Sequence, residues 1–389
     1  MHRVYLDNNA TTPVLPQVFE AMRPYFGERF GNASSIHHYG QETRAAVEDA
    51  RELVSDLLGC SASEVVFTSG GTESDNLAIA GWVAAGDHVI TSSIEHHAVL
   101  HACKHLEKIG CDVTVLPVDG RGLFDPDDVR RALRPNTKLI SLMMANNETG
   151  VLQPLEPVGK IAAEAQILFH TDAVQAAAKV PIDVRRIGCD GLSISGHKIH
   201  AAQGVGALYV KKGTRIQPLF HGGRHERSRR AGTENVPGIV GLGRAAQLAK
   251  ESFERGDDKK MAAMRDRLEQ GILAQLGEAG VNGAVATRAP NTTNIHFDHI
   301  EGESLVIALD LKGLAVSTGA ACSSGAIEPS HVLIAMGLRP KQARASIRFS
   351  LGKQTTESDI DFALTLVPET VGRLRELSPK YKSQVNVVR

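Results

Sequence analysis

The chain has 389 residues, which is long enough for two or three domains and a large hydrophobic core. Its 43 Lys and Arg residues balance 44 Asp and Glu residues, and the formal net charge of −1 argues against binding to nucleic acid or a membrane surface through bulk charge. Aromatic residues make up only 4% of the sequence, which argues against a stacking platform for single-stranded nucleic acid.

Five widely spaced cysteines form no CxxC pair. We therefore expect no disulfide framework and a reducing, cytoplasmic setting. The first residues, MHRVYLDNNATTP, contain no apolar stretch typical of a secretory signal. No apolar run reaches the roughly 18 residues that a membrane-spanning helix needs, so we expect no membrane association.

Short β-rich runs alternate with helical stretches between residues 42 and 216. The predicted strands are residues 65–68, 88–91, 112–116, 139–143, 167–171, 191–195 and 207–210, and the predicted helices between them are residues 41–58, 98–109, 126–133 and 157–165. This alternation predicts an α/β fold with a mostly parallel, seven-stranded central sheet. Such sheets bind their ligands at the carboxyl ends of the strands.

A smaller α+β unit is predicted after a long polar helical run at residues 242–277. Its predicted strands are residues 294–297, 314–317 and 346–350, and its predicted helices are residues 302–311, 328–336 and 357–377. We therefore expect a large domain at residues 15–255 and a small domain made of residues 1–14 and 256–389.

The segment TSGGTESDN, residues 68–76, follows a predicted strand and opens a helix. Gly70 and Gly71 allow close approach of a ligand to the backbone, and Thr72 offers both an N–H and a hydroxyl. A helix N-terminus adds further N–H donors and a favourable dipole, so this segment is a candidate phosphate site. The alternative is a simple glycine turn with Thr72 as the helix N-cap.

Two further strands end in residues that can carry chemistry. Asp172 ends one of them and Gln175 follows, and an acid buried there could bind a metal, act as a base or pair with a protonated heterocyclic nitrogen. Lys198 follows the next strand, beside Ser195 and His197, where a lowered pKa would allow it to form a Schiff base. The alternatives are a helix N-cap for the aspartate and a surface position for the lysine. A phosphate site, an aspartate and a lysine at three strand ends are together what pyridoxal 5'-phosphate requires.

The motifs TSGGTESDN, EHHAV, NNETG, HTDAVQ, SGHK and RRAGTEN resemble, in order and spacing, those of the class V, fold-type I pyridoxal-phosphate enzymes. YLDNNATTP near the start and STGAACSSG late in the chain resemble the NifS/IscS-type cysteine desulfurases, and RRAGTENVPGIVGLG and EPSHVLIAMGL look closer to the NifS branch. The resemblance extends from residue 4 to about residue 362. It implies a transferase that converts L-cysteine to L-alanine and supplies sulfur for iron–sulfur cluster assembly or other thio-cofactors.

The resemblance also implies roles for individual residues. Lys198 would bind the cofactor covalently, and Asp172 would keep its pyridine nitrogen protonated. Gln175 would bond its phenolic oxygen, and His96 would stack on the ring and shuttle the proton of the substrate thiol. The residues that would hold the phosphate are Gly71, Thr72, Ser195, His197 and, from the neighbouring subunit of a homodimer, Thr233.

The same resemblance implies which residues would bind the substrate. Asn147 would contact cofactor and substrate, and Arg348 would bind the substrate carboxylate, for which its planar fork of donors is suited. Arg344 is an alternative for this second role. One departure from the family pattern is AAQG at residues 201–204, where a Gly-Pro-Lys-Gly turn is usual.

Cys322 lies in TGAACSSGA, a run of small residues that predicts a mobile loop. The resemblance implies that Cys322 attacks the substrate sulfur, carries the resulting persulfide and delivers it to an iron–sulfur scaffold protein. We expect no intrinsic metal site, although Cys322 could ligate a cluster shared with that scaffold. His97, His101 and His105 share one helix face, which we interpret as solvated because no Cys or Asp lies nearby to complete a metal site.

Three alternatives remain open from the sequence. The same scaffold could serve a selenocysteine lyase or a class V aminotransferase, and the Cys322 loop disfavours the aminotransferase because that reaction needs no mobile thiol. A non-catalytic partner protein that kept the fold is the third alternative. The joint presence of Lys198, Asp172, His96 and Cys322 argues against it.

Overall fold

A computed structural model describes residues 3–319 and 328–377 of the chain. The strands are β1 (Val4–Tyr5), β2 (Val65–Thr68), β3 (His88–Ser92), β4 (Asp112–Leu116), β5 (Thr137–Ser141), β6 (Leu168–Asp172), β7 (Gly191–Ser195), β8 (Gly206–Val210), β9 (Ala279–Val281), β10 (Thr292–Phe297), β11 (Leu314–Ala315) and β12 (Ser346–Ser350). The helices are α1 (Pro16–Met22), α2 (His38–Leu58), α3 (Gly71–Trp82), α4 (His97–Lys108), α5 (Pro126–Ala132), α6 (Leu155–Ala165), α7 (Val184–Ile187), α8 (Val236–Glu254), α9 (Asp257–Gln275), α10 (Gly302–Leu311), α11 (His331–Ala335), α12 (Pro340–Arg344) and α13 (Glu357–Leu377).

The central sheet has seven strands in the order β2-β8-β7-β6-β5-β3-β4. β8 runs antiparallel to both of its neighbours, and every other adjacent pair is parallel. The predicted α/β fold with a mostly parallel seven-stranded sheet is therefore confirmed. Because the parallel strands are joined by helices, the residues at their carboxyl ends meet at one edge of the sheet.

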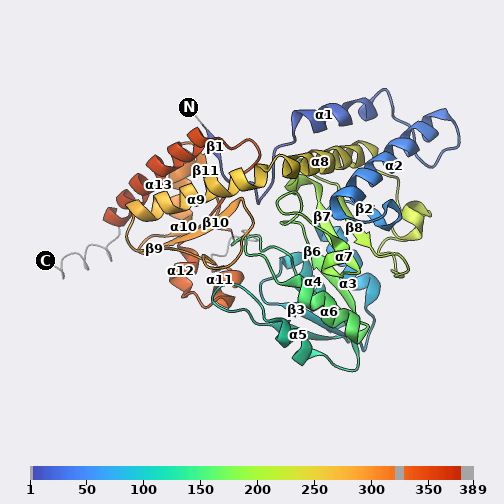
Figure 1. Cartoon of the computed structure of the whole chain (residues 1–389), viewed down its shortest axis with the longest axis horizontal. Coiled ribbons are helices and arrows are strands. Elements are labelled where there is room, and N and C mark those ends of the chain that lie inside the picture. Colours follow the sequence, from blue (N-terminus) through green and yellow to red (C-terminus); the bar gives the residue numbers. More distant parts are fainter. Residues whose placement is uncertain (1–2, 320–327, 378–389) are drawn as a thin grey trace.

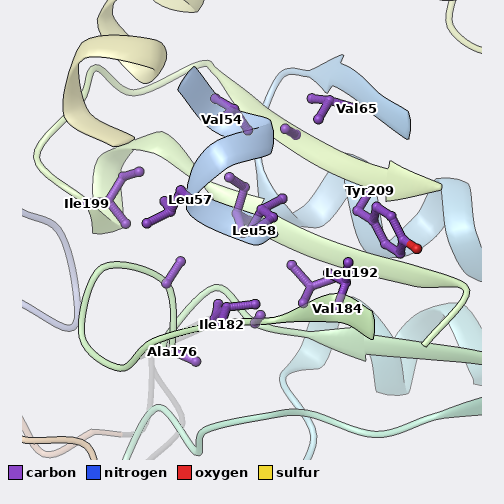
Figure 2. Packing of buried hydrophobic residues seen from close by; sticks show 14 of the residues in the cluster. Val54, Leu57, Leu58, Val65, Ala176, Ile182, Val184, Leu192, Ile199 and Tyr209 are labelled. Atoms are coloured by element: carbon purple, nitrogen blue, oxygen red, sulfur yellow. The ribbon is translucent and has the colours of Figure 1, made fainter. Parts of the chain in front are cut away.

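Helices cover both faces of this sheet, and the strand sequences alternate accordingly. Val66 of β2 and Leu208 of β8 pack in a buried cluster with residues of α3 and α4. The neighbouring Val65 and Tyr209 point to the opposite face and pack in a cluster with residues of α2 and α8. Figure 2 shows this second cluster, with Leu58 of α2 among side chains of the strands. A period of two along each strand is what a sheet buried on both faces requires.

A separate core surrounds a smaller sheet that contains β12, β10 and β9 in antiparallel order. Its buried residues come from that sheet, from α9, α10 and α13, and also from the beginning of the chain, where Val4 and Leu6 are buried. Figure 1 shows β1 and β11 side by side in this part of the molecule, and the two strands pair in parallel. The division into a large domain at residues 15–255 and a small domain at residues 1–14 and 256–389 stays a prediction.

Several element boundaries differ from those predicted. The helical run at residues 242–277 is two helices, α8 and α9, because Gly256 adopts a left-handed φ of 68° that ends α-helical geometry. β5 begins two residues before the predicted strand 139–143. The helix predicted at residues 328–336 is shorter, because Ser330 accepts a hydrogen bond from the N–H of Leu333 and caps α11. Among the described residues, no helix has the length and apolar character needed to cross a membrane.

Candidate functional site

The predicted site residues lie at the carboxyl edge of the central sheet. Asp172 is the last residue of β6, and Ser195 is the last residue of the neighbouring β7. These two strands pair in parallel with Asp172 opposite Ser193, so both ends face the same side. β2 is the other strand that pairs with the antiparallel β8, so its last residue, Thr68, lies at this edge as well.

The residues predicted to bind phosphate lie at the turn between β2 and α3 and at the end of β7. Gly70 is the N-cap of α3, has a φ of 152° and provides no side-chain cap to the helix. A Cβ at Gly206 would come within 2.6 Å of the Gly70 Cα, so the turn can lie against β8 only because residue 206 is glycine. The Ser195 Oγ is 3.6 Å from the position that a Cβ on Gly70 would occupy. Thr72 lies inside the helix, so the alternative in which it is the N-cap is wrong.

Asp172 is 6% exposed, and its Oδ1 accepts a hydrogen bond of 2.8 Å from the N–H of Val174. Burial raises the pKa of Asp172 to about 6. The residues after Asp172 form turns rather than a helix, so the alternative of a helix N-cap does not apply. A buried carboxylate in these surroundings gains stability from a nearby cation, such as a protonated ring nitrogen.

Lys198 follows β7 in the short 3-10 helix Gly196–Lys198. Its Nζ donates hydrogen bonds to the backbone oxygens of Asn9 and Ala10, the second at 2.8 Å. Burial, followed by the charge of Arg348, lowers the pKa of Lys198 to about 8. A lowered pKa makes the neutral amine available, which is the form that attacks a carbonyl group.

His96 is the N-cap of α4, and its Nδ1 accepts a hydrogen bond of 3.1 Å from the N–H of Ala98. Burial, followed by the charge of Lys198, lowers the pKa of His96 to about 4. The ring is therefore neutral at physiological pH, and the hydrogen bond at Nδ1 assigns its proton to Nε2. His96 can donate from Nε2 as it stands, whereas taking up a further proton would cost it the bond to Ala98.

The N-terminal segment lies across this site. Thr11 Oγ1 is 3.1 Å from Nδ1 of His197, and the backbone oxygen of Asn9 accepts a hydrogen bond of 2.9 Å from Nε2 of Gln175. Burial and the charge of Lys198 lower the pKa of His197 to about 4. The sequence prediction missed Asn9 as a member of the site, because nothing in a short polar segment indicates where it will pack.

Arg348, on β12 of the smaller sheet, reaches the site from the opposite side. Its Nη1 donates to the backbone oxygen of Asn147 at 2.9 Å, and its Nη2 is 2.7 Å from Oδ1 of Asp7. The side chain is buried, and its Nε has no hydrogen-bond partner among the described residues. An unpaired, buried guanidinium nitrogen is a donor suited to a bound carboxylate. Arg344, the alternative, ends helix α12.

Cys322 lies outside the described residues, but the residues on both sides of its segment are described. Ser330 Oγ donates a hydrogen bond of 2.5 Å to Oε2 of Glu148, and a Cβ on Gly319 would lie 3.4 Å from Cγ of the same glutamate. Glu148 follows Asn147 in the chain.

Thr233 is exposed and lines a small cavity of about 80 Å³ together with Thr68 and Ser69. Its side chain is therefore not buried within its own chain. This position leaves the expected contact with a neighbouring subunit's phosphate as a prediction.

The residues at the sheet edge fit pyridoxal 5'-phosphate. The uncapped helix α3 and the Ser195 hydroxyl suit a phosphate dianion, and the buried carboxylate of Asp172 suits a ring cation. Lys198 supplies an amine of lowered pKa, and Arg348 supplies a free donor for an amino-acid carboxylate. This donor set is that of an enzyme acting on an amino acid.

Comparisons with known proteins agree with this site. Residues 4–362 match the family described as class-V aminotransferases. A cysteine desulfurase IscS from Methanosarcina thermophila is 52% identical over 380 residues, which cover 97% of this chain and 94% of the relative. A solved structure of a NifS-like protein has a TM-score of 0.89 and 38% identity, and the match covers 96% of this chain and 100% of the other. The solved structure of SspA in complex with cysteine has a TM-score of 0.79 and 38% identity over 89% of this chain and 98% of the other. The chain therefore belongs to the class-V aminotransferase family and, within it, to the pyridoxal-phosphate-dependent cysteine desulfurases.

Proposed function

We propose that this enzyme converts L-cysteine to L-alanine through Lys198 and Cys322 and leaves the sulfur as a persulfide on Cys322. The observation that supports these assignments best is the position of Lys198. It lies one strand away from the buried Asp172, carries a lowered pKa and is close enough to Arg348 for the two charges to interact. These positions support a single site in which Lys198 would be the reactive amine, Asp172 the partner of the ring nitrogen and Arg348 the donor to the substrate carboxylate.

When bound, pyridoxal phosphate supplies an electron sink conjugated to the Cα of the substrate. Lys198 would hold the cofactor before the substrate enters and would then remove the Cα proton as a base. A lysine with a pKa of about 8 suits that task, because a base works best when its pKa is near the operating pH. Asp172 would keep its negative charge beside the ring nitrogen and stabilise the charge that develops there.

Arg348 would orient the substrate by binding its carboxylate. The unpaired Nε is buried and the other two nitrogens are already held by Asn147 and Asp7, so the guanidinium cannot rotate freely. A donor that is fixed before the substrate binds loses little entropy on binding it. This arrangement favours an α-amino acid over an amine that lacks the carboxylate.

Sulfur transfer would use the thiol of Cys322 as the nucleophile. Its thiolate sulfur forms a bond with the substrate sulfur while the Cβ–S bond of the substrate breaks, and the electron pair of that bond stays on carbon. A proton then adds to Cβ, and Lys198 would return a proton to Cα, so that the products are alanine and a Cys322 persulfide. The neutral ring of His96, with its proton on Nε2, could donate a hydrogen bond to the substrate thiol.

The persulfide would pass to an acceptor, for which an iron–sulfur scaffold protein is our proposal because the relative from Methanosarcina thermophila is named IscS. The SspA structure with cysteine supports L-cysteine as the substrate. A reducing, cytoplasmic location agrees with Cys60, Cys103, Cys111 and Cys189, which are all free thiols.

We also propose a homodimer in which Thr233 reaches the phosphate of the partner subunit. Thr233 is exposed, and an aromatic and aliphatic surface on α1, α2 and the segment between them is exposed as well. The exposed side chains of this surface are Phe19, Phe26, Phe30, Ile36 and Tyr39, each more than half exposed. Exposed apolar surfaces of this kind are usual at protein interfaces.

Light scattering on the holoenzyme and on a Phe26→Asp/Phe30→Asp variant tests the dimer. We expect a dimer for the unmodified protein, and a monomer with weakened cofactor binding for the variant. Thr233→Ala should remain a dimer and bind the cofactor less tightly. A monomeric unmodified protein that retains its cofactor would contradict the proposal.

The chemistry is tested by analysing the products formed from L-cysteine under reducing conditions. We expect equal amounts of alanine and sulfide from the unmodified enzyme. Lys198→Ala should form neither product and should lack the visible absorbance of a Schiff base. A keto acid in place of alanine would indicate an aminotransferase, and a strict requirement for selenocysteine would indicate a lyase for that substrate.

A further inference from the structure

Lys179 is a buried lysine that no step of the proposed reaction uses. It lies in the turns that follow β6 and is 9% exposed. Its Nζ donates a hydrogen bond of 2.6 Å to Oε1 of Gln175 and one of 3.2 Å to Oδ1 of Asn9. Both acceptors are neutral amide oxygens.

Burial lowers the pKa of Lys179 well below its ordinary value, and the nearby charges of Lys198 and Arg348 lower it further. An apolar side chain of similar length would avoid the free-energy cost of burying an amine that can be charged. A buried titratable group that is costly to keep, and that lies beside a candidate active site, is a candidate functional group.

The hydrogen bonds of Gln175 fix which way its amide points. The backbone oxygen of Asn9 can only accept, so the atom 2.9 Å from it must be the amide nitrogen of Gln175. The amide oxygen of Gln175 therefore lies on the other side, 2.6 Å from Nζ of Lys179, and accepts a hydrogen bond from it. The two contacts agree on one orientation of the amide, and the amide nitrogen keeps one N–H for a further acceptor.

We propose that Lys179 is a positioning residue, which holds Gln175 so that an amide N–H, rather than the carbonyl oxygen, faces the phenolic oxygen of bound pyridoxal phosphate. This inference rests on the proposed contact between Gln175 and that oxygen. Asn9 strengthens the arrangement, because its side chain accepts from Lys179 while its backbone oxygen accepts from both Gln175 and Lys198.

The orientation has a consequence for the protonation of the bound chromophore. A donor at the phenolic oxygen stabilises its anionic form and so lowers the pH at which the chromophore takes up a proton. A carbonyl oxygen in the same place would repel that anion and have the opposite effect. Lys179 would therefore lower the pH midpoint of the change in visible absorbance of the holoenzyme without touching the cofactor.

The test is a pH titration of the visible absorbance of the substrate-free holoenzyme. Lys179→Met keeps most of the side-chain volume and removes the donors, and we expect it to raise the midpoint by about one pH unit. Lys179→Arg, which retains donors, should restore most of the original midpoint. Lys353→Met is the matched control, because Lys353 lines a small cavity together with Lys179 but donates to the backbone oxygen of Leu248. The midpoint of this variant should equal that of the unmodified holoenzyme.

Gln175→Leu separates this inference from the proposed cofactor contact on which it rests. If Lys179 acts through Gln175, Gln175→Leu raises the midpoint and adding Lys179→Met raises it no further. If Gln175→Leu shifts the midpoint and Lys179→Met does not, the inference is wrong and the contact between Gln175 and the cofactor stands. If neither variant shifts it, that contact is wrong and the inference fails with it. Lys179→Leu provides the same comparison should Lys179→Met not fold.

Discussion

At the scale of single residues, burial shifts the pKa of each site group in the direction that favours its neutral form. The pKa of Asp172 rises to about 6 while the pKa values of Lys198 and His96 fall to about 8 and about 4. These shifts describe a site in which charges are costly until an oppositely charged ligand arrives. A cofactor with a ring cation and a phosphate dianion removes part of that cost, so cofactor binding and folding stability are linked.

Asp172→Asn tests the free-energy cost of keeping an ionised carboxylate buried at this position in the cofactor-free protein. The folded state binds the Asp172 proton more tightly than the unfolded chain does, so the contribution of Asp172 to stability falls as the pH rises through 6. The asparagine variant cannot ionise, and we expect its free energy of unfolding to exceed that of the unmodified protein by about 1–3 kcal/mol at pH 8. The difference should shrink at pH 5.

Denaturant unfolding of both cofactor-free proteins at the two pH values measures this effect. With the cofactor bound, the order should reverse, because the variant loses the carboxylate that we propose pairs with the ring nitrogen. A variant that is less stable at pH 8 without cofactor would show that the charge of Asp172 is already compensated within the chain.

The two candidate arginines give a second prediction at this scale. Arg348→Lys removes the planar fork of donors, and we expect KM for L-cysteine to rise about 10- to 100-fold with a smaller change in kcat. Arg344→Lys is the matched control, because Arg344 lies on α12 and should leave KM unchanged. Steady-state kinetics decide between them, and a larger effect at Arg344 would reverse the assignment.

At the scale of elements, the strands were easier to predict than the helix ends. Strands β2, β4 and β7 have the predicted bounds, since each is a short apolar or β-branched run bounded by turn residues. The break between α8 and α9 was not predicted, because the surrounding residues continue a helical pattern. Only the backbone at Gly256 interrupts this pattern. A single glycine inside a helical pattern is compatible with a continuous helix and with a break between two helices.

Gly256→Ala tests whether this break depends on glycine. An alanine at a φ of 68° is strained although no atom lies within 4 Å of its Cβ, so we expect a loss of about 1–2 kcal/mol in the free energy of unfolding. Gly277→Ala is the matched control, because its Cβ would also meet no atom within 4 Å and its φ is not left-handed. Equal stability of the two variants would contradict the prediction.

At the scale of the whole molecule, the sequence predicted the sheet, the strand ends and the residues placed there. It could not predict how the beginning of the chain reaches the site. The backbone N–H of Asn9 donates to Oγ of Ser350, and its side chain bonds Thr292, so contacts across nearly the whole chain place it beside Lys198. Such contacts follow from tertiary packing and leave no periodic pattern in the sequence.

The role of Lys179 was hidden for a related reason. Its position four residues after Gln175 does not predict a contact between the two side chains, because the residues between them form turns rather than a helix. Its burial and its two amide acceptors become visible only when Asn9 is in place. Sequence motifs therefore identified the residues expected to touch the cofactor, and the fold was needed to find Lys179, which we propose orients Gln175.

The most direct test of the account is peptide mass spectrometry of the holoenzyme after brief exposure to L-cysteine and trapping of persulfides by alkylation. We expect one added sulfur atom on the peptide that contains Cys322. Cys60 and Cys103 should stay unmodified, because burial raises the pKa of each thiol to about 12. Cys322→Ala should retain the cofactor absorbance, carry no added sulfur and form no alanine. Added sulfur on another cysteine, or full turnover by Cys322→Ala, would contradict the account.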